Sequence, residues 1–381
     1  MIHPVGYHEA PQGLQRITDL DEAWAQARHG GQLRAVRQRA ERLRERFASG
    51  PRCVSVRTMP LSMLAYPTRY AFWAAALAPA PFVIMTHRCV LVQFLRNGEL
   101  KNLLFNPTDI EAAKATPFFA RFIESFGSRL SDMMAGKFDS LEVQLARLGI
   151  MPEDIDYVAF DHFHTQDLRG LLGTEDGART PRFPNAQLLA PKSEWDDWDD
   201  LHPFQKAWFV RDGKIGVLRD KVVLTSGDHM LGDGVMLLRT PGHTSGNQTL
   251  FLNTESGVWG ISENGTCADN WSPLESRIKG LAFLCKKQDL DVVLNANTPE
   301  YGALQYTSMI LERTIVDRVR RAPAFVQMFP SSEVTPSLIS PGLTPSLLHR
   351  AITHGEVARG ARASSSRAAA PANATTSGAS A

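Results

Sequence analysis

The sequence lacks an excess of charge of either sign. Its 381 residues include 41 lysines and arginines against 40 aspartates and glutamates, so the formal net charge at pH 7 is +1. A chain with almost no net charge has no general electrostatic attraction to nucleic acid or to anionic membranes, and we expect neither as a partner. The arginines from Arg34 to Arg46 alternate with Glu41 and Glu45. This pattern favours a solvated helix face over a basic helix that binds nucleic acid or a membrane surface.

Cysteine is also scarce, and the four cysteines are far apart in the chain: Cys53, Cys89, Cys267 and Cys285. No Cys-x-x-Cys pair occurs. This spacing favours buried thiols in a reducing compartment over a disulfide framework.

Long apolar runs and targeting signals are missing as well. The longest apolar stretch, Ala71–Met85, contains Pro79 and Pro81. It is shorter than the roughly 20 residues that a membrane span requires. Residues Met1–His8 have neither the charged region nor the apolar region of a secretory signal. We therefore predict a cytoplasmic protein.

Enough apolar sequence is present for a large core, since 43% of the residues are hydrophobic. We predict a helical N-terminal extension over residues 1–51, a main domain over 52–325 and a C-terminal segment over 326–381. From about residue 359 the chain is mostly Ala, Ser, Thr, Gly, Arg and Pro, which predicts disorder. Within the main domain, Asn97-Gly98 between two apolar runs predicts a tight β-hairpin.

Three histidines occur directly after apolar runs of strand type. His162 and His164 follow Ile155–Ala159, and His243 stands in a Pro-Gly turn after Leu237-Leu238. A looped His-x-His turns both imidazoles toward one point, and neutral imidazole binds zinc, iron, nickel or copper. A third histidine at a strand end makes a metal site the better explanation for the pair.

At this point the chain resembles the metallo-β-lactamase superfamily. The resemblance runs from about residue 52 to about residue 321 and implies an α+β fold, an αββα sandwich of two mixed β-sheets flanked by helices. It rests on four segments: Leu145–Val158 leading to His162-x-His164, the Thr240–Gly246 loop with His243, the strand end at Glu263 and the strand end at Asn297.

The family's second metal site is altered in this sequence. The family has His-x-His-x-Asp-His, a bridging Asp and a last His. Here Gln166 stands in place of the first Asp and Asp167 in place of the following His. Glu263 replaces the bridging Asp, and Asn297 occupies the position of the last His.

The resemblance implies a metallo-hydrolase in which a metal-bound hydroxide attacks an ester, lactone, thioester or amide bond of a small molecule. The expected metal ligands are His162, His164 and His243 together with Glu263 and Asp167. The same two carboxylates are the candidate catalytic residues, as ligand, base or acid. One zinc ion is expected, with iron or a second ion as alternatives.

Two other functions stay open from the sequence. One is a non-heme iron oxidoreductase on the same fold, because two histidines and a carboxylate also suit iron. The other is a non-catalytic descendant that binds a ligand in the altered site. The sequence leaves the substrate and the oligomeric state open.

Overall fold

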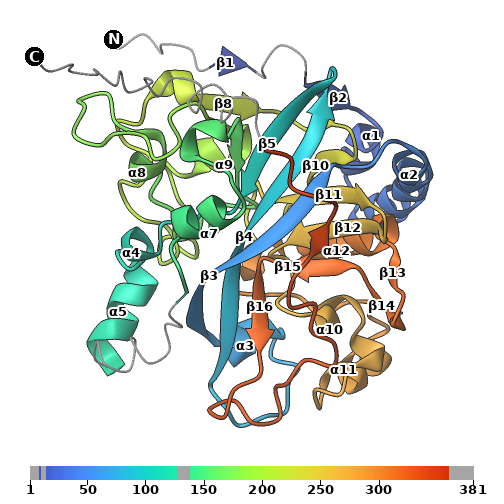
Figure 1. Cartoon of the computed structure of the whole chain (residues 1–381). Helices are drawn as coiled ribbons and strands as arrows, with labels where there is room; N and C mark the ends of the chain where they lie inside the picture. Colours follow the sequence, from blue (N-terminus) through green and yellow to red (C-terminus); the bar gives the residue numbers. More distant parts are fainter. Residues whose placement is uncertain (1–7, 10–13, 127–137, 360–381) are drawn as a thin grey trace, which may run out of the picture.

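A computed structural model describes residues 8–9, 14–126 and 138–359 of the chain (Figure 1). In this part of the chain, two large β-sheets pack face to face and helices cover their outer faces. The predicted α+β fold, an αββα sandwich, is confirmed.

The first sheet has nine strands in the order β1-β8-β7-β6-β5-β4-β3-β17, and β16 also pairs with β4. Strands β3 to β5 are antiparallel, whereas β5, β6, β7, β8 and β1 run parallel to one another. Their bounds are β1 His8–Glu9, β3 Ser55–Pro67, β4 Phe82–Arg96, β5 Glu99–Phe105, β6 Tyr157–Ala159, β7 Gln187–Pro191, β8 Val222–Thr225, β16 Ser332–Thr335 and β17 Thr353–His354.

The second sheet has six strands in the order β15-β12-β11-β10-β9-β2. They are β2 Gln15–Ile17, β9 Asp228–Gly232, β10 Val235–Arg239, β11 Gln248–Thr254, β12 Gly257–Ser262 and β15 Met328–Pro330. A separate ribbon pairs β13 Arg318–Val319 with β14 Ala322–Val326.

Helices lie outside the two sheets (Figure 1). They are α1 Asp21–Trp24, α2 His29–Ser49, α3 Thr68–Ala71, α4 Ile110–Ala113, α5 Pro117–Phe126, α7 Leu141–Arg147, α8 Arg169–Leu172, α9 Lys192–Asp197, α10 Ala268–Trp271, α11 Leu281–Gln288 and α12 Gly302–Ile315. Single turns of 3₁₀-helix occur at Pro152–Asp154, Arg219–Lys221, Pro273–Glu275 and Pro299–Tyr301.

The alternation of side-chain direction along each strand produces the layers of the sandwich. In β4, Val90 and Val92 belong to the core between the sheets, whereas Cys89 and Leu91 belong to the core under the helices. Successive strand side chains point to opposite faces, so a strand that is apolar at every position is covered on both sides. The other sheet is covered by α2 and α12, which contact each other along their lengths.

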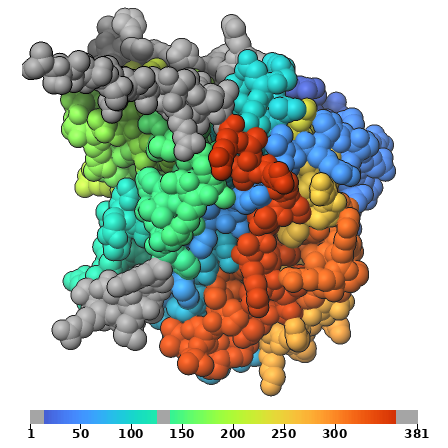
Figure 2. Space-filling view, in the orientation of Figure 1, coloured from blue at the N-terminus to red at the C-terminus, as the bar shows by residue number. Residues whose placement is uncertain are grey.

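The N- and C-terminal segments are part of the same body. β2 joins the second sheet, α2 packs on that sheet's outer face, and β15 and β16 add strands to both sheets. The last described residues, red in Figure 2, lie along the surface of the molecule. The division at residues 52 and 325 stays a prediction, and the predicted disordered tail falls mainly on residues 360–381, outside the described residues.

The predicted hairpin at Asn97-Gly98 is confirmed. Both residues have positive φ, 53° and 80°, and they join β4 to β5. Across the described ranges, none of the helices combines the length and the apolar character needed to cross a membrane.

Candidate metal centre

The two histidine loops are fastened to each other at the ends of their strands. Gln248, the first residue of β11, donates from its backbone N to the Asp161 carbonyl (2.9 Å) and from Nε2 to the Phe160 carbonyl (2.8 Å). The loop after β6 in the first sheet is thereby joined to the start of β11 in the second. This junction brings together histidines that are 79 residues apart in the chain.

The three predicted histidines form one cluster. Ring centroids lie 4.6 Å apart for His162 and His164, 4.4 Å for His162 and His243, and 4.9 Å for His164 and His243. One ligand atom from each lies within 4.8 Å of the other two. Among the described residues, this is the one group of three or more His, Cys, Asp or Glu side chains with that property.

Hydrogen bonds orient two of the rings. His162 Nδ1 lies 2.7 Å from Asp161 Oδ1, and His164 Nε2 lies 2.7 Å from Gln205 Oε1. Both partners are acceptors, so these nitrogens carry the ring hydrogens and His162 Nε2 and His164 Nδ1 keep their lone pairs. His164 Nδ1 is 3.2 Å from His243 Nε2. Two ligands of a tetrahedral zinc ion are separated by about 3.3 Å, so the residues present fit such an ion.

The pKa values of the histidines also suit a cation. Burial, followed by the charge of His162, holds the pKa of His164 well below its usual value. The same two causes, with the charge of His164 in addition, lower the pKa of His243. Both rings are therefore neutral at pH 7, which is the form that binds a divalent metal.

A buried carboxylate that the sequence reasoning missed holds both loops. Glu194 on α9 is 1% exposed, and it accepts from Phe163 N at Oε1 (2.9 Å) and from Gly246 N at Oε2 (3.1 Å). A Cβ on Gly246 would lie 2.4 Å from Glu194 Cβ, so this approach requires glycine. The sequence does contain one sign of this role. Glu194 stands next to Trp195 directly after an apolar strand, and a charged side chain in a buried position needs hydrogen-bond partners.

Glu263 lies where the sequence placed it, at the end of β12 and on the cavity that the three histidines line. Its Oε2 accepts from Ser332 N at 2.9 Å. Burial, and then the charge of Asp161, raise its pKa well above the usual value. The carboxylate oxygens of Glu263 are not among the ligand atoms that lie within 4.8 Å of one another. Its role as metal ligand or base therefore stays a prediction.

Asp167 is held away from the cluster. It pairs with Arg169 (2.6 Å) and Arg179 (3.4 Å), and it is neither in the ligand group nor among the residues that line the cavity. Burial alone would raise its pKa, but the hydrogen bonds and charge of Arg169 lower it. Because two arginines satisfy this carboxylate, the geometry does not support the expected ligand and acid–base roles of Asp167.

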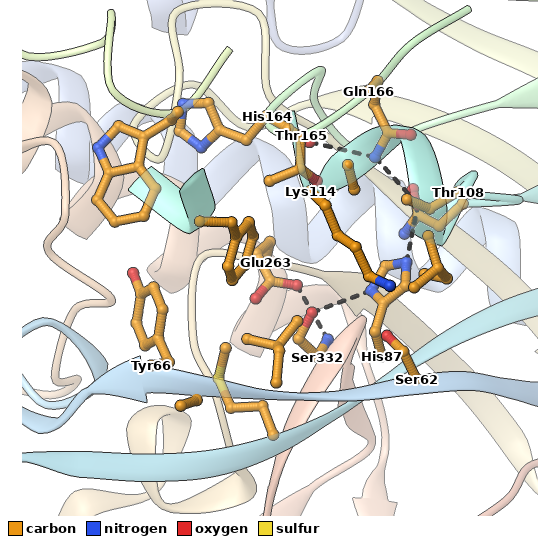
Figure 3. A pocket seen from close by; sticks show the side chains of 18 of the residues that line it. Ser62, Tyr66, His87, Thr108, Lys114, His164, Thr165, Gln166, Glu263 and Ser332 are labelled. Atoms are coloured by element: carbon orange, nitrogen blue, oxygen red, sulfur yellow. Dashed lines mark hydrogen bonds between the residues drawn. The ribbon is translucent and has the colours of Figure 1, made fainter. Parts of the chain in front are cut away.

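A chain of hydrogen-bonded side chains forms another part of the polar wall, which Lys114 also lines (Figure 3). Gln166 Nε2 donates to Thr108 Oγ1 (3.0 Å), which lies 2.9 Å from His87 Nε2. His87 Nδ1 in turn is 3.1 Å from Ser332 Oγ. No hydrogen-bonding partner of His87 stands near it in the chain. Its partners come from the loop after β5 and from β16.

The same cavity has a large apolar wall. Side chains from β3, β4, α4 and α5 form it, among them Leu64, Met85, Ile110, Phe119, Phe122 and Ile123. Trp208 stacks on Phe118 of α5, with centroids 4.5 Å apart, and closes one side. The cavity therefore joins a polar end, with the histidines, to an apolar space.

Comparisons with known proteins give partial matches. No family model matches the chain. An N-acyl homoserine lactonase from Bacillus sp is 31% identical over 111 residues, 29% of this chain and 38% of that protein. An N-acyl homoserine lactonase from Bacillus cereus is 29% identical over 117 residues, which are 31% of this chain and 40% of that protein. The chain thus matches less than half the length of these curated relatives.

A solved structure, described as a probable metal-dependent hydrolase from Staphylococcus aureus, is 14% identical with a TM-score of 0.47. The overlay covers 68% of this chain and 83% of that one. The architecture of the chain itself is more informative: a helix-covered pair of mixed sheets, with one histidine pair after β6 and a third histidine between β10 and β11. This architecture is the αββα sandwich that the resemblance in sequence implied. In this sandwich, the described residues present the ligand atoms of one three-histidine site.

Proposed function

We propose that the protein is a metal-dependent hydrolase that cleaves an ester or lactone bond. The observation that carries the proposal is the convergence of three imidazoles at the polar end of a cavity. A divalent ion held by three such ligands supplies a nucleophile from water at neutral pH and polarises a carbonyl oxygen. We propose one zinc ion in this position.

The residues of the chain orient and enclose the reacting groups. Asp161 and Gln205 fix two of the imidazole rings, and Glu194 fixes the distance between their loops. Glu263, on the same cavity, is the candidate for holding the attacking water. Trp208 and α5 form the apolar side of the cavity.

The substrate class comes from the relatives and from the cavity. The curated relatives are named N-acyl homoserine lactonases, which supports a lactone or ester as the cleaved group. The wall formed by Met85, Phe119 and Phe122 supports an apolar chain on the acyl side. In the part of the chain that the structure describes, all four cysteines are free, which agrees with our proposal of a cytoplasmic location.

Elemental analysis tests the proposal. Zinc, iron and manganese would be counted per chain in the wild-type protein and in His243→Ala, with His202→Ala, at an exposed histidine, as the control. We expect about one zinc per chain, lost only in His243→Ala, together with hydrolysis of esters or lactones. Iron in its place would favour the oxidoreductase, and no metal after reconstitution would favour a ligand-binding protein.

A further inference from the structure

Asn297 has a buried amide oxygen that no other described residue satisfies. Its Oδ1 has no hydrogen-bond partner among these residues, although only 6% of the residue is exposed. Leaving a buried acceptor unpaired costs stability, and such groups need an explanation. Asn297 lines the cavity of the three histidines, so a ligand in that cavity can reach the amide after rotation about its last side-chain torsion.

The neighbours of Asn297 fix it beside the third histidine. Asn295 Nδ2 lies 3.4 Å from His243 Nδ1, and the Thr298 hydroxyl donates to the His243 carbonyl. Gln305 holds the same segment, because its Nε2 donates to the Asn295 carbonyl (2.6 Å). The residue between Asn295 and Thr298 therefore lies near His243 and lines the same cavity.

Two other polar side chains on or beside the cavity have partners for the oxygens named here. Asn295 Oδ1 accepts from the Tyr66 hydroxyl (2.7 Å), and Glu263 Oε2 accepts from Ser332 N (2.9 Å). An amide oxygen that lacks a donor in the protein is complementary to a donor on the ligand. A site that hydrogen-bonds such a group also rejects analogues that lack it.

We propose that Asn297 binds a hydrogen-bond donor of the substrate, a hydroxyl or an amide N–H carried next to the scissile carbonyl. This inference rests on the proposed function, since it names the substrates of the same cavity: acyl compounds with an apolar chain and an adjacent donor. Asn297 is thus a specificity residue, and the unpaired amide lowers the stability of the ligand-free protein.

The test compares ligands with the same eight-carbon chain that differ in the substituent at C2, which either lacks or carries a hydrogen-bond donor. Binding of octanoate, 2-hydroxyoctanoate and 2-acetamidooctanoate to the zinc-loaded full-length protein would be measured by calorimetry. Hydrolysis of the three methyl esters would be measured separately. We expect one donor-bearing ligand to bind about five- to tenfold more tightly than octanoate. The hydroxy and acetamido ligands distinguish the two kinds of donor.

Variants assign the preference to Asn297. Asn297→Leu has nearly the same shape but no polar atom, so it should remove the preference. Its melting temperature should be no lower than that of the wild type, because an unpaired acceptor has been deleted. Asn297→Asp keeps an acceptor and should retain the preference. Asn185→Leu, at an exposed asparagine outside the cavity, is the control. Zinc per chain would be counted in every variant.

The outcomes separate this inference from the proposed function. A wild-type protein that binds none of the ligands, or binds all three equally, would overturn the role of Asn297. So would a preference that survives in Asn297→Leu, or a fall in its melting temperature of more than about 4 °C, which would indicate a structural role. If the preference depends on Asn297 but no ester is hydrolysed, the specificity stands and the hydrolase fails.

Discussion

Glu194 is the best test of how the metal centre is held together. Its two carboxylate oxygens accept from Phe163 N, which lies between His162 and His164, and from Gly246 N, three residues after His243. Glu194→Gln keeps one acceptor and turns an NH₂ group toward the other backbone N–H. One buried N–H then has no partner, which costs about 1–3 kcal/mol of the free energy of unfolding.

The effect on metal binding follows from the same contacts. Without the second acceptor, the loop of His164 and the loop of His243 lose one of their links, although Gln248 still joins them. Loss of a group that orients metal ligands lowers metal affinity about 10- to 100-fold. We expect Glu194→Gln to bind zinc more weakly by this factor.

A chromophoric chelator that competes for zinc would give the dissociation constant, and urea unfolding would give the stability. Asp196→Asn is the matched control, because it lies on the same helix α9 and pairs only with Lys192, at the surface. Zinc affinity equal to that of the wild type in Glu194→Gln, with Asp196→Asn also unchanged, would refute the role of Glu194 in spacing the two loops.

Three further predictions concern single residues. Burial holds the pKa of His349 at about 3, against about 6.5 in the unfolded chain. The native protein therefore loses stability as pH falls between these values, and His349→Phe should flatten the pH dependence of the free energy of unfolding by about 1.4 kcal/mol per pH unit between pH 6 and 4. An unchanged slope would contradict this. Asp167→Asn should keep its zinc, as measured by elemental analysis, whereas loss of zinc would return Asp167 to the ligand set. Phe122→Ala should shift the preferred ester toward longer acyl chains, since loss of the ring enlarges the apolar part of the cavity. The exposed Phe283→Ala is its control, and an equal shift in both variants would exclude Phe122 as the cause.

The resemblance in sequence implied the sandwich fold, and local patterns predicted the main part of the site. The structure shows why the layers form, since a strand that is apolar at every position must be covered on both faces. The spacing of His162 and His164 directly after a strand is a local property too. The pair, with His243 in its Pro-Gly turn, was therefore identified before the loops were seen to meet.

Only the tertiary structure decided which side chains complete the site. Asp167 is adjacent to the histidine motif in sequence, yet Arg169 and Arg179 hold it outside the cavity. Glu194 joins the histidine loops from positions 31 and 52 residues away in the chain. The sequence pattern specifies backbone conformation and the face on which a side chain lies. The direction of a buried polar group depends instead on partners from distant segments, and folding alone brings these together.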